Sequence, residues 1–403
     1  MRQAAYLHLP FCRRRCFYCD FPISVVGDRA RGETSGTITD YVHWLCREIQ
    51  ATPHDGASLH SVFLGGGTPS LLSPDQVERI LITLDQRMGI ASGAEISMEM
   101  DPGTFTLAQL RSLQAAGINR VSLGVQAFQE DLLAACGRSH RRSDIEAAAT
   151  WISQAQVANW SLDLISGLPG QTLAQWEESL NCAIALGPTH LSCYDLVLEP
   201  PTVFAKREAA GQLKLPPQEE TAMMYRLACD QLPAAGFQHY EISNYARSGY
   251  QCRHNLTYWR NQSFYGFGMG ASSYHDQRRV ARPNRRVDYY AWVEGLEQQP
   301  ATYFQTVPPL SWRDRLFETL MVGLRLTAGI DITALAQEFG ESALAPVVHQ
   351  LRSFVAQGWV VLDAEGGQVR RLRLTDPEGL LYSNQVLVSI LETLEAPPLP
   401  TSG

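Results

Sequence analysis

Two hydrophobic periods alternate along the first half of the chain. Short strand-like runs, apolar throughout or alternating between apolar and polar residues, occur at 5–9, 61–64, 95–100, 120–125, 160–165 and 190–197. Helical patterns lie between them: Ser73 precedes Pro74 as a helix cap, and 106–113 repeats apolar residues at helical spacing. Six repeats of strand and helix predict an α/β fold, a partial (β/α)6 barrel whose working residues lie at the C-terminal ends of its strands.

The pattern changes after the sixth strand. A helical stretch at 218–235 leads into 240–274, which is rich in Tyr, Asn and Gly and has little helical periodicity. A linker rich in Arg and Pro follows, and 312–388 then has helical patterns with a short β pair at 359–363 and 371–375. We expect a barrel over 1–235, an aromatic and glycine-rich extension over 236–305, a small, mostly helical and winged-helix-like domain over 306–395, and a disordered tail over 396–403.

The composition is that of an ordinary globular protein, with 45% hydrophobic and 18% charged residues in 403. The nine cysteines are odd in number and clustered near the N-terminus, which favours a reducing compartment over a disulfide framework. Met1 leads directly into the first strand without a signal peptide, and no apolar run reaches the ~18 residues of a spanning helix. We therefore expect a cytoplasmic protein. A net charge of −8 argues against nucleic acid as a partner.

Three cysteines directly after the first strand, Cys12, Cys16 and Cys19, are the strongest chemical signal in the chain. A structural zinc ion needs four ligands, and no second Cys-x2-Cys or His-x3-His pair follows to complete such a site. An iron–sulfur cube can be held by three thiolates, which leaves one iron open to a small chelating molecule. Zinc and unrelated reduced thiols remain the alternatives.

The run from Tyr6 to Phe21, YLHLPFCRRRCFYCDF, resembles the cysteine motif of the radical S-adenosylmethionine (SAM) superfamily. This resemblance implies that Cys12, Cys16 and Cys19 hold a [4Fe-4S] cluster. It also implies that the amino and carboxylate groups of SAM bind the open iron, and that an electron from the cluster cleaves the sulfonium.

Polar residues stand where the predicted strands end. The run Gly65-Gly66-Gly67-Thr68-Pro69 resembles the segment that holds the amino group of SAM in this superfamily, and a tight turn between strand and helix is the structural alternative. Glu99, Gln126 and Asp163 lie at the ends of the next three strands, and Arg138 follows Gln126 by twelve residues. Each alone is more often a structural hydrogen-bonding residue. Together they supply acceptors for the amine and ribose hydroxyls and a cation for the carboxylate of SAM.

The whole set of motifs is similar to oxygen-independent coproporphyrinogen III oxidase and its relatives, over nearly the whole chain. By this resemblance the SAM site is lined by Tyr6, Tyr18, Gly66, Gly67, Thr68, Pro69, Glu99, Gln126, Arg138 and Asp163. Two features resemble the haem chaperone branch of these relatives, HemW. The cysteine motif continues as Cys19-Asp20-Phe21, where the oxidase usually has Cys-x-Cys, and 254–259 reads His-Asn-Leu-Thr-Tyr-Trp, which fits the His-Asn-x-x-Tyr-Trp segment of that branch.

The resemblance implies that His254 is an axial ligand of haem iron, with Tyr258 and Trp259 offering flat apolar surface to the macrocycle. Taken without the resemblance, these residues are more typical of a hydrogen-bonded loop histidine beside aromatic core residues. Five arginines downstream are candidates for the haem propionates, although a solvated charged linker is the alternative that their composition favours; they are Arg278, Arg279, Arg282, Arg285 and Arg286.

The sequence therefore predicts a haem chaperone that binds a [4Fe-4S] cluster, SAM and haem and transfers haem to an unidentified acceptor protein. It needs an electron donor for the cluster, and no catalytic residue is assigned. A homodimer and transient membrane contact remain open. The first alternative is the oxidase itself, in which a 5′-deoxyadenosyl radical abstracts hydrogen from the propionates of coproporphyrinogen and carbon dioxide leaves. The second is a zinc-stabilised barrel.

Overall fold

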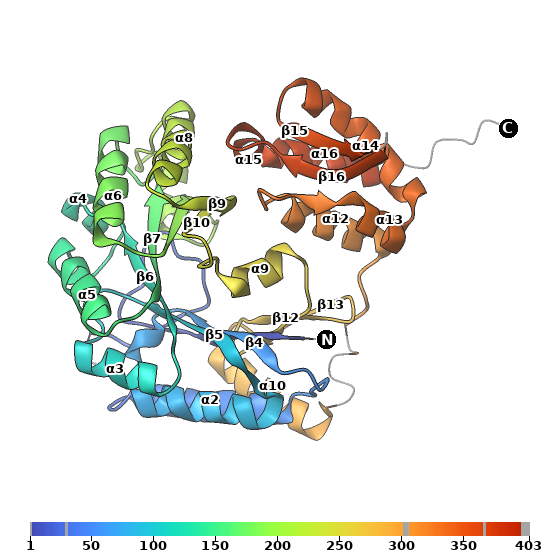
Figure 1. Cartoon of the computed structure of the whole chain (residues 1–403). Helices are drawn as coiled ribbons and strands as arrows, with labels where there is room; N and C mark the ends of the chain where they lie inside the picture. Colours follow the sequence, from blue (N-terminus) through green and yellow to red (C-terminus); the bar gives the residue numbers. More distant parts are fainter. Residues whose placement is uncertain (1, 29–30, 301–304, 306, 366–367, 396–403) are drawn as a thin grey trace. The chain divides into compact units, whose positions relative to one another are not determined.

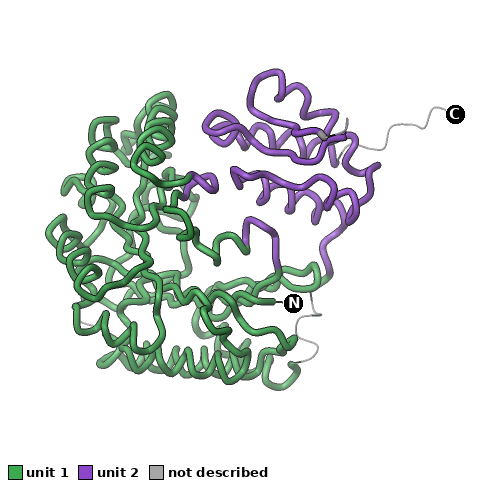
Figure 2. The backbone as a smooth tube through the Cα atoms, in the orientation of Figure 1, with its two compact units in different colours: residues 1–238, 245–257, 263–308 green, residues 239–244, 258–262, 309–403 purple. Residues whose placement is uncertain are grey.

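The computed structural model describes residues 2–28, 31–300, 305, 307–365 and 368–395, so the expected disordered tail over 396–403 lies outside the described residues. The chain divides into two compact units (Figure 2). The first comprises Met1–Gln238, Tyr245–Thr257 and Ser263–Pro308, and the second His239–Asn244, Tyr258–Gln262 and Pro309–Gly403. Among the described residues, every helix is too short or too polar to cross a membrane.

A nine-stranded sheet, counted over the described ranges, has the order β11-β1-β4-β5-β6-β7-β8-β10-β9. Neighbouring strands from β11 to β8 pair in parallel. The strands are β1 (Ala4–Leu9), β4 (Leu59–Gly66), β5 (Ile90–Met100), β6 (Arg120–Gln126), β7 (Asn159–Ser166), β8 (His190–Asp195), β9 (Gln238–Glu241), β10 (Asn244–Ala246) and β11 (Tyr265–Phe267). Each of the six predicted strands overlaps one of the strands from β1 to β8, so the predicted parallel α/β architecture is confirmed.

Helices follow these strands and lie along the sheet (Figure 1). They are α1 (Gly36–Ala51), α2 (Pro74–Met88), α3 (Leu107–Ala115), α4 (Glu130–Ala135), α5 (Arg142–Gln154), α6 (Leu173–Leu186), α7 (Val203–Ala209) and α8 (Gln218–Ala234). The predicted start of α2 is confirmed: the Ser73 hydroxyl accepts from the Gln76 backbone N–H, and the Gln76 side chain accepts from the Ser73 N–H. Each helix returns the chain to the edge of the sheet at which the strands begin. The C-terminal ends of the strands therefore all lie at the opposite edge, which forms one mouth.

Alternate residues of the central strands divide into an apolar and a polar set. In β6, Val121 and Leu123 belong to the buried hydrophobic core, whereas Arg120 and Ser122 alternate with them and are also buried. Successive side chains of a strand point to opposite faces, so one face of the sheet packs in the hydrophobic core and the other is lined with polar groups. The chemistry of the mouth comes from this polar face.

The segment after residue 250 corrects two expectations. The block over 240–274 contains helix α9 (Arg253–Trp259), and the expected arginine-rich linker folds as β12 (Ser272–His275), β13 (Arg278–Ala281) and α10 (Arg286–Gln298). Helix α9 and strands β12 and β13, with 7, 4 and 4 residues, are too short to show a clear hydrophobic period, whereas α10, with 13 residues, is long enough and was missed. The expectation of a solvated linker is wrong for Arg282, whose buried side chain makes an ion pair of 2.8 Å with Glu48 of α1.

The second unit contains the predicted helical C-terminal region. Its elements are α12 (Trp312–Gly323), β14 (Ile330–Asp331), α13 (Ile332–Phe339), α14 (Glu341–Ala356), β15 (Val360–Glu365), β16 (Gln368–Leu374), α15 (Glu378–Leu381) and α16 (Ser383–Glu395). The predicted β pair is present as β15 and β16, which run antiparallel, and β14 joins them in a small sheet. Apolar residues of α14 and α16, such as Leu351 and Ile390, are fully buried.

Candidate functional site

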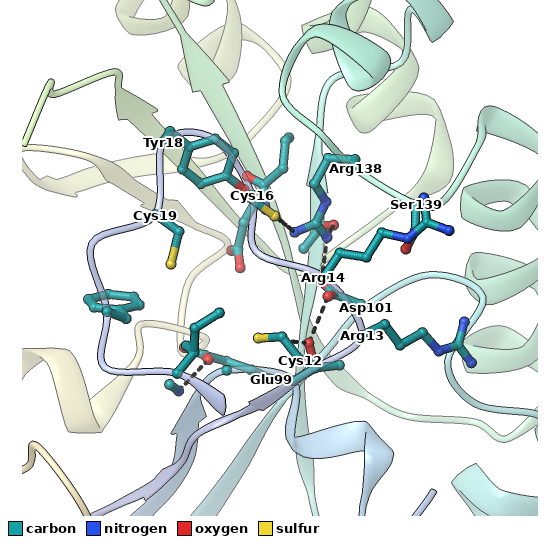
Figure 3. A pocket seen from close by; sticks show the side chains of 18 of the residues that line it. Cys12, Arg13, Arg14, Cys16, Tyr18, Cys19, Glu99, Asp101, Arg138 and Ser139 are labelled. Carbon is teal, nitrogen blue, oxygen red and sulfur yellow. Dashed lines mark hydrogen bonds and ion pairs between the residues drawn. The ribbon is translucent and has the colours of Figure 1, made fainter. Parts of the chain in front are cut away.

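A cavity of about 420 Å³ lies at the mouth where the parallel strands end (Figure 3). Eleven of the predicted site residues line it: Cys12, Tyr18, Cys16, Cys19, Gly66, Gly67, Thr68, Glu99, Gln126, Arg138 and Asp163. Tyr6, Pro69 and His254 are not among the lining residues. The cavity thus combines the cysteine loop with polar groups from β4 to β7.

The cysteine loop leaves β1 and is closed on itself. Short strands β2 (Phe11–Cys12) and β3 (Ser24–Val25) pair in parallel at its ends, and the Arg15 guanidinium donates to the carbonyls of Cys19 (3.2 Å) and Phe21 (3.1 Å). The side chains of the three cysteines face a common space (Figure 3). The backbone therefore presents all three sulfurs to one ligand.

The spacing of the three thiols bears on the kind of metal they suit. Among the described side chains, Cys12, Cys16 and Cys19 do not form a group whose ligand atoms all lie within 4.8 Å of one another. Thiolates around a single zinc ion lie ~3.8 Å apart, given Zn–S bonds of about 2.3 Å in a tetrahedron. A larger group that bridges the three sulfurs, such as a cluster, fits this donor set better.

The electrostatics of the loop suit a cationic guest. Burial, and then the charge of Asp101, raises the pKa of the Cys12 thiol to about 12, and burial raises the pKa of the Cys19 thiol. Thiolates bind iron, so binding must displace these protons, and the metal charge must replace the solvation that the sulfurs have lost.

Glycine is required at the turn that follows β4. Gly66 has a φ of +111°, and a Cβ there would lie 2.5 Å from the His8 ring. A Cβ on Gly67 would lie 2.7 Å from the Phe11 carbonyl oxygen. The Gly67 N–H donates to the Leu9 carbonyl (2.9 Å), which fastens the turn to the end of β1. The glycine run is thus set by close packing beneath the cavity.

Glu99 is a buried carboxyl at the cavity wall. Its Oε2 accepts from the Gly66 N–H at 2.9 Å, and burial, with smaller effects of Asp163 and Asp101, raises its pKa to about 8. A bound ammonium group beside Glu99 would favour the carboxylate and supply the missing counter-charge.

Arg138 is a buried cation in the cavity wall, which Arg13 and Arg14 also line. Its Nη2 donates to Asp101 and to the Gly124 carbonyl (2.8 Å), and its Nη1 lies 3.5 Å from both Cys16 Sγ and the Tyr18 hydroxyl. Burial lowers the pKa of Arg138, but the neighbouring Asp101 outweighs it, so the pKa lies above its ordinary value. A guanidinium in this position can bind a carboxylate.

Asp163 and Gln126 complete the polar wall. Asp163 accepts from the Ser122 hydroxyl (3.0 Å) and the Ser161 hydroxyl (3.1 Å), while burial raises its pKa. Gln126 has a φ of +69°, at a register irregularity between β6 and β7. A non-glycine residue in this region is uncommon and is often found at functional sites. Both residues line the cavity.

The three remaining candidates lie elsewhere. The Tyr6 hydroxyl lies 3.1 Å from His8 Nδ1, and Pro69 starts a buried 3-10 turn. His254, on α9, is 1% exposed. Its Nδ1 lies 3.1 Å from Ser61 Oγ, and its ring stacks on Phe63 with centroids 5.2 Å apart.

Several cavity residues were not predicted, among them Asp101, Ser122, Thr104 and Tyr194. Asp101 had a readable signal: it follows Glu99 by two residues and therefore shares its face of the chain. Tyr194 and Ser122 had none, since a tyrosine or serine in a strand is usually structural.

Comparison with known proteins agrees with this geometry. The family model described as the radical SAM superfamily matches residues 6–183, and the HemN C-terminal domain matches 310–381. The chain is 51% identical to the haem chaperone HemW of Synechocystis sp. over 98% of both chains. It is 33% identical to the HemW of Escherichia coli, over 95% of this chain and 96% of the relative.

A solved structure supports the fold. The coproporphyrinogen III oxidase HemN from Escherichia coli, described as a radical SAM enzyme, superimposes with a TM-score of 0.77 at 22% identity, over 98% of this chain and 90% of that one. At this identity the likeness establishes the architecture alone. The full-length identity to HemW relatives establishes more: this chain belongs to the HemW haem chaperone family of the radical SAM superfamily.

Proposed function

We propose that this chain is a haem chaperone that binds one [4Fe-4S] cluster, SAM and haem, and transfers haem to an acceptor protein. The observation that carries the proposal is the cavity itself, in which three cysteine thiols face a buried carboxyl, Glu99, and a buried cation, Arg138, in a chain of the HemW family. The relatives named haem chaperones supply the haem part of the proposal.

The residues divide the proposed work by charge. Cys12, Cys16 and Cys19 would hold the cluster, which when bound supplies a single electron at low potential. Glu99 would accept a hydrogen bond from the amino group of SAM, and Arg138 would donate hydrogen bonds to the carboxylate of SAM. The two groups are held by different parts of the cavity wall. Glu99 accepts a hydrogen bond from the glycine turn, and Arg138 donates one to the end of β6.

Asp163 and Gln126 would hold the ribose end of SAM. The Asp163 carboxyl oxygens already accept from the hydroxyls of Ser122 and Ser161, which supports a role as acceptor for the ribose hydroxyls. Bound SAM would occupy the route by which water reaches the three thiols, because all these groups line the same cavity.

Haem binding through His254 requires a rearrangement. The imidazole is held inside the barrel by Ser61, and the His254 backbone N–H donates to Glu95 Oε1 at 3.2 Å. Haem iron reaches this ring only after the start of α9 has moved. We therefore propose His254 as a ligand that the protein exposes when haem binds.

The oxidase remains the second candidate, favoured by one observation: the three cysteines, Glu99 and Arg138 line one cavity, and SAM cleavage would need the same groups as SAM binding. One experiment separates the two. Reconstituted protein with verified iron and sulfide is titrated with haemin, and is separately given SAM, a strong reductant and coproporphyrinogen III without oxygen. Stoichiometric haem binding without tri- or dicarboxylic porphyrin products supports the chaperone. Products that depend on Cys12, Cys16 and Cys19 identify an oxidase, and failure to bind haem rejects the chaperone.

A further inference from the structure

The Asp101 carboxylate bonds to two side chains, Thr68 and Arg138 (Figure 3). Each of these side chains is also a hydrogen-bond donor near one of the three cysteine sulfurs. Asp101 directly follows β5, and its backbone is fixed at both ends: its N–H donates to Ser70 Oγ (3.3 Å), and its carbonyl accepts from the Thr104 hydroxyl (2.6 Å). The backbone of Asp101 is therefore fixed, and the bonds to Thr68 and Arg138 orient its carboxylate.

One carboxylate oxygen competes with a cysteine for a proton. The Thr68 hydroxyl lies 3.0 Å from Asp101 Oδ2 and 3.7 Å from Cys12 Sγ. A hydroxyl has one proton to donate. The nearer, charged oxygen is the stronger acceptor, so Asp101 takes the proton that would otherwise go to the Cys12 sulfur.

The other oxygen engages the donor of the second cysteine. Asp101 Oδ1 accepts from Nη2 of Arg138, and Nη1 of the same guanidinium lies 3.5 Å from Cys16 Sγ. The carboxylate thus offsets the positive charge that Arg138 brings to Cys16. Its own negative charge also lies in the wall of the cavity that the sulfurs share.

We propose that Asp101 is a positioning residue that keeps the reduction potential of the bound cluster low, by taking the Thr68 proton from the Cys12 sulfur and offsetting the positive charge that Arg138 brings to Cys16. Hydrogen bonds to cluster sulfurs and nearby positive charge stabilise the reduced form and raise the potential. A carboxylate that takes the donor proton and offsets the cation opposes both effects. This inference rests on the proposed cluster and concerns its electron affinity.

The test is the reduction potential of the reconstituted cluster without SAM. Asp101→Asn keeps the shape of the side chain, removes its charge and weakens its acceptor. We expect the potential to rise, with the equilibrium constant for one-electron reduction growing about tenfold, which is ~59 mV. Asp75→Asn is the matched control: Asp75 is an exposed carboxylate in the first turn of α2 and does not line the cavity, so its loss should leave the potential unchanged.

A second variant tests the same arrangement with the opposite sign. Thr68→Val removes the shared hydroxyl and leaves the carboxylate without that donor, so the potential should fall, whereas Thr68→Ser should match the wild type.

Iron and sulfide content are measured in every variant. A wild-type protein without a cluster would reject the proposed cofactor. Intact clusters whose potentials are the same in Asp101→Asn, Thr68→Val and the wild type would reject the role of Asp101. If Asp101→Asn loses its cluster, the Thr68 pair decides.

Discussion

Ser61 Oγ lies 3.1 Å from Nδ1 of His254, so the histidine that the sequence presents as a haem ligand is held inside the barrel. The ring is also stacked on Phe63 and lies beside Tyr6, with centroids 6.4 Å apart. Burial, with a smaller effect of Arg120, lowers the pKa of His254 to about 3, which keeps the imidazole neutral. A neutral imidazole is the form that binds iron, but here it is in a closed position.

We call the arrangement in which His254 is bonded to Ser61 the closed state. If haem iron binds His254 only after it leaves this state, destabilising the closed state should tighten haem binding. Ser61→Ala removes the Ser61–His254 hydrogen bond, which is worth about 0.5–1.5 kcal/mol. Because the apparent affinity is scaled by the fraction of open molecules, we expect haem to bind about 2- to 12-fold more tightly. Equilibrium titration followed by haem absorption measures this change.

Two variants complete that experiment. Ser179→Ala removes another buried serine, bonded to Gln129 on the outer helices, and should leave haem affinity unchanged. His254→Ala should weaken binding and alter the haem spectrum. Equal affinities and spectra for Ser61→Ala, His254→Ala and the wild type would show that His254 does not bind the iron.

The three loop cysteines should be jointly required for iron. Replacing Cys12, Cys16 or Cys19 with Ser should abolish the cluster absorption and reduce acid-labile sulfide to background after reconstitution, because no other described cysteine lines the cavity. Cys182→Ser, on α6, is the control and should keep full iron and sulfide content. Zinc bound in place of iron and sulfide would contradict the cluster.

The raised pKa of Glu99 predicts how stability depends on pH. The carboxyl titrates at about 8 in the folded chain and at about 4.3 when unfolded. The folded state therefore holds more protons between these values, and its stability falls as pH rises from about 4.3 towards 8. Glu99→Gln should remove this loss, so that the variant without SAM gains stability over the wild type at pH 8 and not at pH 4.

Urea unfolding at several pH values measures this effect, with the exposed Glu33→Gln as the control for lost charge. SAM binding gives a second check. If the amine of SAM requires the Glu99 carboxylate, SAM affinity should increase from pH 6 to pH 8 in the wild type and be weak in Glu99→Gln. Equal pH dependence in both proteins would remove Glu99 from the amine site.

Gly66→Ala should destabilise the turn beneath the cavity. A side chain at positive φ costs about 1–2 kcal/mol. The new Cβ would also meet the His8 ring at 2.5 Å, which adds an overpacking cost of about 1–3 kcal/mol. Gly187→Ala, with a φ of +74° and open space around its Cβ, should show the backbone cost alone. Equal unfolding free energies for the two variants would show that His8 yields without strain.

The buried pair of Arg282 and Glu48 should contribute strongly to stability. Glu48 also accepts from the Tyr289 hydroxyl and the Gly268 N–H, both at 2.7 Å, so it joins α1, α10 and the turn after β11. Arg282→Met leaves this carboxylate unpaired and should cost about 3–5 kcal/mol of unfolding free energy. Arg285→Met is the control, since its side chain is 78% exposed, and should change stability little.

Much of the fold could be predicted because its signals are local. Central strands such as β6 and β7 alternate apolar and polar residues, and Ser73 and Pro74 mark a helix start wherever the helix later packs. Strand β11 has only three residues, and it is a strand because it pairs with β1 across Ala5 and Tyr265. Such long-range pairing leaves no period in the sequence, which is why the short elements between residues 253 and 281 were missed, whereas the helices and the β pair after residue 312 were predicted.

The sequence by itself determined the chemistry of the cavity: the spacing of Cys12, Cys16 and Cys19 places three thiols on one loop, and polar residues at strand ends meet at one mouth because parallel strands share an edge. Only the tertiary structure decided which of two neighbouring arginines, Arg282 or Arg285, is buried. Only the tertiary structure brings the His254 ring to the Ser61 hydroxyl. The physical reason is that burial and hydrogen bonding depend on partners far along the chain, which residue type and spacing do not specify.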